Sequence, residues 1–222
     1  MTHEAFLLSK IDFLRDDEET KIFESVVKMA ADDAQESLTI AMKEIQPGHR
    51  RFTHFLVERN LCPWDLFGER FDCHAKGFYR TIFELDNLVL FQKYQEQIKS
   101  IYFHSRFVSD LHKELVKHAS VNILDFLKFT EEQAKSCLST TVDYILNDRK
   151  VTDKRRRMME YLCKKYDTTM QLTNYFMYFF RFQKEYFLRF LMELGVKCSP
   201  EQLATLRNKD ERLYDKVFSE DV

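Results

Sequence analysis

The sequence predicts an all-α fold, and three observations lead to this prediction. Only four glycines and three prolines occur among 222 residues, although all-β folds rely on these residues for their turns. Apolar side chains recur at spacings of three and four residues, as they do on one face of a helix. Several of these segments follow a helix-start signal. With 45% hydrophobic residues, the composition is that of a globular chain.

Capping signals define the clearest helix boundaries. Thr130 and Ser199 are each followed three residues later by glutamine, which predicts a capping box at a helix start. Pro200 and Pro63 suit the first turn of a helix, and Gly195 suits the left-handed end of one. The expected helices span residues 3–14, 18–33, 36–46, 49–61, 63–74, 78–104, 106–118, 130–147, 153–166, 170–194 and 200–218.

These helices are expected to form a single all-α domain over residues 1–222. The alternative is a small N-terminal helical head, residues 1–90, followed by a larger C-terminal bundle, residues 91–222. The short run Val121–Leu124 is compatible with an extended segment, but it is too short to indicate a sheet. No repeat of 20–50 residues is visible in the sequence.

The most unusual segment is rich in aromatic residues: nine of the sixteen residues from Tyr175 to Phe190 are Phe or Tyr. Such side chains bury large areas and dominate cores and interfaces. Arg181, Lys184 and Glu185 interrupt the segment, and charges are costly in hydrocarbon, so we expect no membrane span here. The segment therefore predicts a helix enclosed by core, by a partner or by an apolar ligand.

This predicted helix has two faces. One consists of Phe and Leu side chains and is expected to be core. The other, here called the hydroxyl-tipped face, is formed mainly by tyrosines, which are common at interfaces, and is the candidate site for a ligand or a second subunit. Its members are Tyr175, Tyr178, Phe182 and Tyr186.

Charge and cysteine content restrict the possible partners and compartments. The net charge of −2 gives no overall attraction to nucleic acid or to an anionic membrane. Eight basic and two acidic residues nevertheless fall between Arg149 and Lys165, a run that suits a solvated helix face, contact with phosphates or an acidic partner. Five cysteines without framework spacing, and no signal peptide, predict free thiols and a cytoplasmic protein.

No pattern of residues predicts a cofactor, a metal site or an enzyme. Cys62, Cys73 and His74 lack the short-spaced pairs of zinc sites. His54 and Glu58 have the spacing used in di-iron bundles, but the second such motif is missing. Nucleophile elbows and phosphate-binding glycine loops are absent as well. The segment Arg106–His112 has the Arg and His spacing of HEPN nucleases, and this remains a remote alternative.

Part of the N-terminal half resembles the helix-turn-helix region of TetR-family transcriptional regulators. Thr20–Ala31 and Glu36–Ile40 are similar to the first head helix and the start of the second. Phe52–Phe55 and Leu61 resemble the end of the recognition helix and the leucine after it. In this placement the DNA contacts would come from Arg50 and Arg51.

A second placement of the same resemblance lies later in the chain. Leu66 and Phe67, then Ala75–Arg80, Phe83 and Leu88, also resemble a recognition helix and its exit. The residues that would then meet the DNA backbone are Lys76, Tyr79 and Arg80.

Two functions follow as hypotheses. The TetR resemblance implies a homodimeric, ligand-responsive regulator that binds duplex DNA and holds a small apolar ligand in its aromatic-lined C-terminal bundle. The alternative is a non-enzymatic helical protein–protein interaction module that binds no DNA, in which the aromatic residues are core or form a partner groove.

Overall fold

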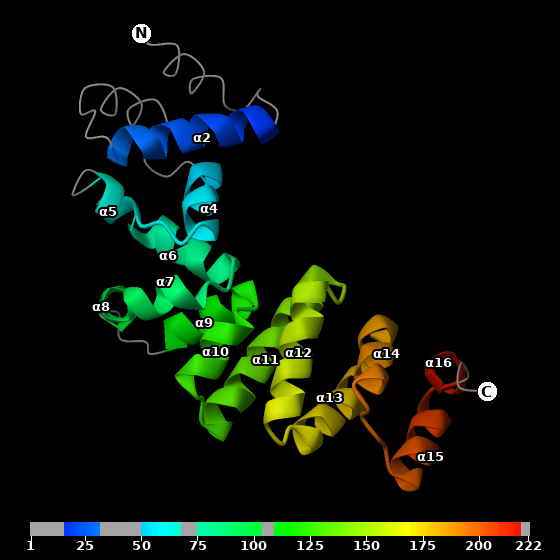
Figure 1. The fold of residues 1–222 in the computed structure, drawn as a ribbon. Helices are drawn as coiled ribbons and strands as arrows, with labels where there is room; N and C mark the ends of the chain where they lie inside the picture. The colour runs from blue at the N-terminus through cyan, green and yellow to red at the C-terminus, as the bar shows by residue number, and fades with distance from the viewer. Residues whose placement is uncertain (1–15, 32–49, 68–74, 104–108, 219–222) are drawn as a thin grey trace. The chain divides into compact units, whose positions relative to one another are not determined.

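A computed structural model describes residues 16–31, 50–67, 75–103 and 109–218, and within these ranges it contains helices and no strand (Figure 1). The all-α prediction is confirmed. The chain divides into two compact units, residues 1–111 and 112–222. The expected boundary at residues 90 and 91 falls inside α7 of the first unit.

The helices of the first unit are α2 (Asp16–Ala31), α4 (Arg50–Glu58), α5 (Pro63–Phe67), α6 (Ala75–Glu84), α7 (Leu88–Lys93) and α8 (Gln95–Phe103). Those that follow are α9 (Ser109–His118), α10 (Val121–Leu127), α11 (Glu131–Asp148), α12 (Asp153–Lys165), α13 (Thr169–Arg181), α14 (Glu185–Glu193), α15 (Pro200–Lys209) and α16 (Glu211–Phe218). The helices expected over residues 3–14 and 36–46 lie outside the described residues.

Aromatic packing joins α2 to α4 in the first unit. Phe23 lies with its ring centroid 5.0 Å from Phe52 and 5.3 Å from Phe55. Ile22, Val26 and Leu56 complete this buried cluster. All of these side chains face one another because they recur at spacings of three and four on their helices.

The single helix expected over residues 78–104 is instead three helices, α6, α7 and α8. Asp86 adopts a left-handed conformation with φ of 51°, and the Asn87 side chain caps α7 by accepting from Leu90 N at 3.0 Å. The same side chain donates to Val57 O at 2.8 Å. Asn87 thus ends one helix and starts the next, although no glycine or proline marks the break.

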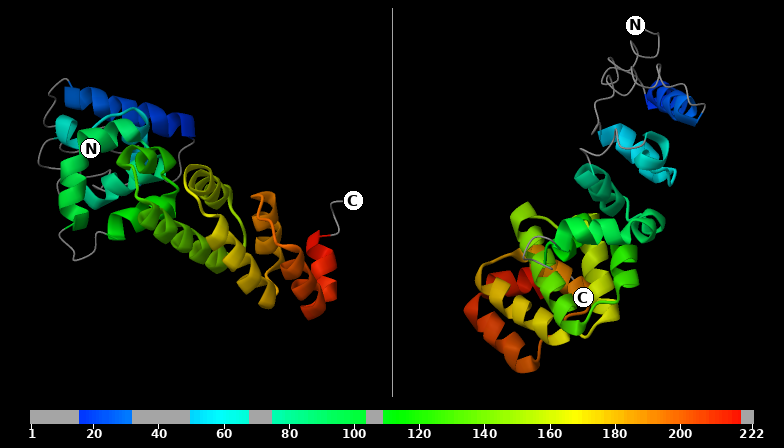
Figure 2. Two further views of the ribbon diagram at one scale, coloured as in Figure 1. Left: turned by 90° about the horizontal axis from the view of Figure 1, so that it is seen from below. Right: turned by 90° about the vertical axis from the view of Figure 1, so that its left-hand side faces the viewer.

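The second unit is built from successive helical hairpins, α11–α12, α13–α14 and α15–α16 (Figure 1; Figure 2, left). Helix α13 also contacts α15, and α14 contacts α16, so corresponding helices of the last two hairpins pack on each other. Hairpins that stack on their neighbours in this way are the building principle of α-solenoids. The last two hairpins follow this principle, although the sequence shows no repeat.

Both predicted capping boxes are confirmed. Thr130 and Ser199 accept from the backbone N–H three residues on, and the corresponding glutamine side chains accept from their backbone N–H groups. Gly195 has the expected positive φ, 83°. The run Val121–Leu124, for which an extended segment was an alternative, is helical and belongs to α10.

The expected aromatic helix over residues 170–194 is divided. Helix α13 ends at Arg181 and α14 begins at Glu185, with Gln183 in a left-handed conformation at φ of 52°. The turn folds the two halves against each other, and Phe176 and Phe187, one from each half, are both fully buried. No turn residue in the sequence signals this break. The break is favoured because it allows both Phe-rich stretches to be buried against each other. The expected helix over residues 200–218 likewise divides at Asp210 into α15 and α16.

Candidate functional site

Two of the four residues predicted on the hydroxyl-tipped face lie open to solvent. Tyr178 is 56% exposed and Phe182 is 50% exposed, and their ring centroids are 4.8 Å apart. Met170 lies about two helical turns before Tyr178 on α13 and is 80% exposed. Large apolar side chains exposed together are candidates for a contact surface.

The other two residues of that face are engaged within the protein. Tyr175 is half-buried, and its hydroxyl lies 2.8 Å from Ser139 Oγ of α11, a hydrogen bond that joins α13 to α11. Tyr186 is half-buried at the start of α14, where burial raises the pKa of its hydroxyl. The predicted face therefore consists of an exposed pair, Tyr178 and Phe182, and two half-buried tyrosines that pack against the rest of the protein.

Two clefts lie at the tips of the last two hairpins, and Arg181 and Gln183, the residues on either side of Phe182 in the chain, line one of them. Gln183 Nε2 donates to Asp210 Oδ2 at 3.0 Å and thereby joins the turn between α13 and α14 to the turn between α15 and α16. A cleft of about 420 Å³ is lined by Phe180, Arg181, Gln183, Lys209 and Asp210. A second cleft, of about 330 Å³, is lined by Gln183, Glu185, Asp210, Arg212, Leu213 and Lys216.

The carboxylates in these clefts are already satisfied. Asp210 accepts from Leu213 N at 2.9 Å as well as from Gln183, so it caps α16. Glu185 lies 3.2 Å from Arg189 Nη2 and 3.6 Å from Lys216 Nζ. Neither carboxylate therefore needs a further cation.

Several cations at the hairpin tips have no such partner. Within the ranges the structure describes, no ion pair or hydrogen bond occupies the side chains of the following exposed residues. They are Arg181, Lys184, Lys209 and Arg212. Helix α13 itself contains no acidic residue. The tips thus combine exposed rings with uncompensated positive charge, which attracts anionic groups.

The residues predicted to contact DNA lie on two helices of the first unit, α4 and α6, and differ in their exposure to solvent. Arg50 and Arg51 are exposed at the start of α4, and Arg50 Nη2 donates to both carboxylate oxygens of Glu84 at 3.3 Å. Arg80 is exposed on α6. Lys76 lies on α6, but its side chain falls outside the described residues.

Tyr79 does not lie on the surface where the resemblance would place it. It is 3% exposed, with its ring stacked on Trp64 at a centroid distance of 5.7 Å. The apolar face of α6 turns inward at this position, so the ring serves the core of the first unit. A buried Tyr79 ring cannot contact a DNA backbone.

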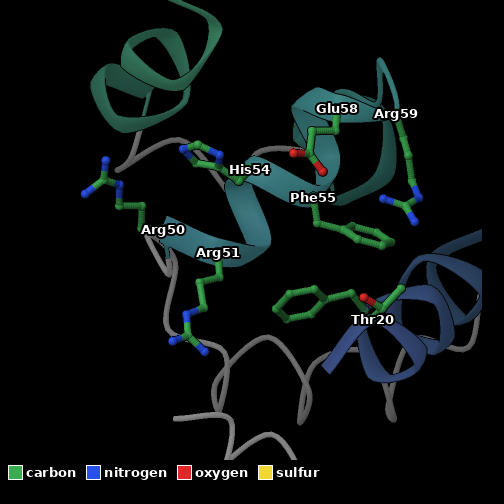
Figure 3. Close-up of a pocket in the computed structure, with 8 residues that line it drawn as sticks. Thr20, Arg50, Arg51, His54, Phe55, Glu58 and Arg59 are labelled. Carbon is green, nitrogen blue, oxygen red and sulfur yellow. The ribbon is translucent and has the colours of Figure 1, made fainter. Parts of the chain in front are cut away.

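A pocket of about 560 Å³ lies between α2 and α4 (Figure 3). Arg50 and Arg51 stand at one end of α4, Glu58 and Arg59 stand at the other, and Phe55 faces α2 between them. The Arg59 guanidinium lies 3.8 Å from the centroid of the Phe55 ring. The pocket is therefore aromatic at its base and largely cationic at its rim.

The residue patterns considered for metal binding and catalysis lie only partly within the described residues. His54 Nε2 lies 3.0 Å from Glu84 Oε2, so its carboxylate partner is on α6 and is not Glu58. Among the described residues, no group of three or more His, Cys, Asp or Glu side chains is arranged to hold a metal ion. Cys73, His74 and Arg106 lie outside the described residues. His112 packs on the Phe129 ring, and burial lowers its pKa.

The basic run is distributed between the interior and the surface of the second unit. Arg155 is buried, and Arg156 Nη1 donates to Glu193 Oε2 at 2.6 Å. Lys150 and Lys154 are exposed. The run is therefore partly structural, and it does not form one continuous cationic face.

Comparison with protein-family models, with curated proteins and with solved structures found no match. No helix in the described ranges is both long enough and apolar enough to cross a membrane.

Sequence reasoning found the aromatic pair but missed the cations beside it. Lys209 and Arg212 belong to the helices after the aromatic segment, and only the packing of α13 on α15 and of α14 on α16 brings them to the same edge. The one available signal was the absence of acidic residues between Thr168 and Lys184.

Proposed function

We propose that this chain is a non-enzymatic helical interaction module whose hairpin tips bind an acidic polypeptide segment carrying an apolar anchor. The observation behind this proposal is the combination, at one edge, of two clefts, an exposed aromatic pair and unpartnered cations. Aromatic and arginine side chains are the types enriched where proteins bind one another.

The exposed pair supplies the apolar part of this surface. Tyr178 and Phe182 contact each other and leave about half of each side chain in water, so their apolar area is available to a partner. Burial of that area favours association by roughly 25 cal/mol per Å² before the costs of ordering are counted. An aliphatic or aromatic side chain of the partner is the complementary group.

The cations supply the selectivity for an acidic partner. Arg181 and Lys209 line the first cleft and Arg212 lines the second, and none of the three is compensated within the described residues. A carboxylate that approaches this edge gains charge-assisted hydrogen bonds without displacing an internal partner. A basic segment would be repelled there, which gives discrimination as well as affinity.

Selection from a displayed library of short random peptides tests this proposal directly. We expect the recovered peptides to be enriched in Asp and Glu together with Leu, Phe or Trp. The charge-reversed variant Arg181→Glu/Lys209→Glu should bind a recovered peptide at least roughly ten-fold more weakly, because each lost charge-assisted contact contributes about 1.5–3 kcal/mol.

A matched control separates this edge from overall charge. Lys150→Glu/Lys154→Glu makes the same change in net charge at exposed positions of the second unit away from the clefts. This control should leave peptide affinity within about two-fold. Equal losses in both double variants, or recovery of peptides without acidic residues, would exclude the proposed surface.

The ligand-responsive, DNA-binding regulator is the competing hypothesis, and it is examined in parallel. Binding to random duplex DNA is measured over a series of salt concentrations. Affinity that falls steeply with salt and is weakened by Arg50→Ala/Arg51→Ala would favour the regulator. Absence of DNA binding at low salt, together with selected acidic peptides, would favour the interaction module.

A further inference from the structure

The two compact units of the chain carry opposite net charges. Residues 1–111 contain 19 acidic and 14 basic side chains, whereas residues 112–222 contain 17 acidic and 20 basic ones. The formal charges of the units are therefore −5 and +3, although that of the whole chain is only −2. Opposite charges on two parts of one molecule favour contact between unlike parts when two copies meet.

Part of the positive charge of the second unit lies at the hairpin tips described above. The exposed cations there are those of Arg181, Lys184, Lys209 and Arg212, and no ion pair or hydrogen bond within the described residues engages their side chains. The exposed rings of Tyr178 and Phe182 belong to the same hairpin as Arg181. A complementary segment therefore carries several carboxylates and an apolar side chain.

The first unit contains a segment with this composition. Asp16–Glu19 is the longest run of acidic residues in the sequence, and Phe13 and Leu14 come shortly before it. From Asp12 to Lys21 there are five acidic and two basic residues. The carboxylates and the apolar anchor that the hairpin tips require thus occur together within seven residues, 13–19.

The local structure of the acidic run does not account for all of its charge. Helix α2 begins at Asp16, so the four acidic residues form its first turn. The N-terminal end of a helix carries a positive charge of about one half, which favours carboxylates at that position. Four carboxylates exceed this charge several-fold, so the helix end alone does not neutralise them.

We propose that the hairpin tips of one copy of this chain bind residues 13–19 of a second copy. This partner extends the function proposed above and depends on it. The carboxylates of Asp16–Glu19 pair with the cations of the tips, while Phe13 and Leu14 supply the apolar anchor for Tyr178 and Phe182. Every copy carries both halves of the contact, so segment and tips are always present in equal amounts. Contacts between unlike surfaces close into a dimer or ring, or extend into a chain of copies.

Analytical ultracentrifugation of the full chain tests this proposal without any substitution. We expect association that increases with protein concentration between about 1 μM and about 1 mM, and that weakens as salt is raised from about 0.05 M to about 0.5 M. A monomer over the whole range, or association that salt leaves unchanged, would overturn the proposed partner. If selected acidic peptides still bind the tips of that monomer, the interaction module stands and only the second copy is excluded.

Two charge-reversed variants identify the surfaces that meet. Glu18→Lys/Glu19→Lys and Arg181→Glu/Lys209→Glu each place like charges opposite one another, so each variant alone should self-associate at least roughly ten-fold more weakly than the unaltered chain. A mixture of the two retains one unaltered contact, between the acidic segment of the second variant and the tips of the first. The mixture should therefore associate at least roughly ten-fold more tightly than either variant does alone. A mixture that associates no better than its components would contradict the pairing of these two surfaces.

A matched control tests whether the acidic run matters by its position or only by its charge. Glu58→Lys/Glu96→Lys makes the same change in net charge as Glu18→Lys/Glu19→Lys, at exposed positions of the same unit. Self-association of this control should stay within about two-fold of that of the unaltered chain. Equal losses in the control and in Glu18→Lys/Glu19→Lys would show that overall charge, and not residues 13–19, drives association.

Discussion

Arg155 is expected to stabilise the second unit more than its exposed neighbours in the basic run do. Its side chain is 8% exposed, and Nη1 donates to Val116 O at 3.1 Å and to Lys117 O at 2.9 Å. These two carbonyls lie in the last turn of α9, where the regular helical donors run out, and Val116 O also accepts from Ala119 N at 3.2 Å. The guanidinium also lies 4.3 Å from the centroid of the Tyr144 ring.

The magnitude for Arg155→Met follows from these contacts. Each hydrogen bond from a charged donor contributes about 1.5–3 kcal/mol, so two of them give an upper value of about 6 kcal/mol. Methionine keeps most of the aliphatic packing and removes the cost of burying a charge, a cost large enough to lower the pKa of Arg155. We therefore expect a net loss of about 2–3 kcal/mol in the free energy of unfolding, from the loss of the two hydrogen bonds and mainly from the Lys117 carbonyl, since Val116 O still accepts from Ala119 N at 3.2 Å.

Urea denaturation followed by circular dichroism measures this loss. With a slope of about 1–3 kcal/mol per molar urea, the midpoint should move by roughly 1–2 M toward lower urea. Lys154→Met is the matched control, since it replaces an exposed cation on the same helix and should change stability by less than about 0.5 kcal/mol. If Arg155→Met is no more destabilising than Lys154→Met, the two hydrogen bonds do not stabilise the fold and the reasoning fails.

Three further outcomes are expected. Asn87→Ala should destabilise the chain by about 2–3 kcal/mol in urea titrations, because it removes both the cap on Leu90 N and the donor to Val57 O; a loss below about 0.5 kcal/mol would contradict this. Lys128→Gly should raise the free energy of unfolding by roughly 0.5–1 kcal/mol, since the exposed Lys128 has φ of 52°, and a decrease would argue against strain there. Cys137 should resist alkylation of the folded protein at pH 8 and react after unfolding, because burial raises its thiol pKa to about 12 and leaves little reactive thiolate below that pH; rapid labelling of Cys137 in the folded protein would refute this.

Only part of the proposed binding edge can be predicted from the spacing of aromatic residues in the sequence. Tyr178 and Phe182 could be chosen in advance because their spacing sets them apart from the Phe-rich face of the same segment. Tyr186 shares their face only if the helix is continuous, and the turn at Gln183 places it on another helix with different surroundings. A face predicted across a helix break cannot be correct on both sides of the break.

Burial of charged and polar side chains was the harder part to anticipate. Arg155 and Arg156 are adjacent in a run of four basic residues, yet one lies in the interior and the other pairs with Glu193 at the surface. Tyr79 and Arg80 likewise point to opposite environments. Neighbouring positions on a helix differ by about 100°, so only the location of the packing partner decides which side chain turns inward.

The sequence by itself determined the helical class, the capping boxes at Thr130 and Ser199, and the left-handed helix end at Gly195. These are local features, in which a side chain satisfies backbone groups within one turn of itself. The tertiary structure decided where long apolar stretches bend, how hairpins stack, and which distant cations share an edge or a pocket. Those outcomes depend on the free energy gained when segments far apart in the chain bury apolar area against each other. That free energy is gained only once the segments are in contact in the folded structure.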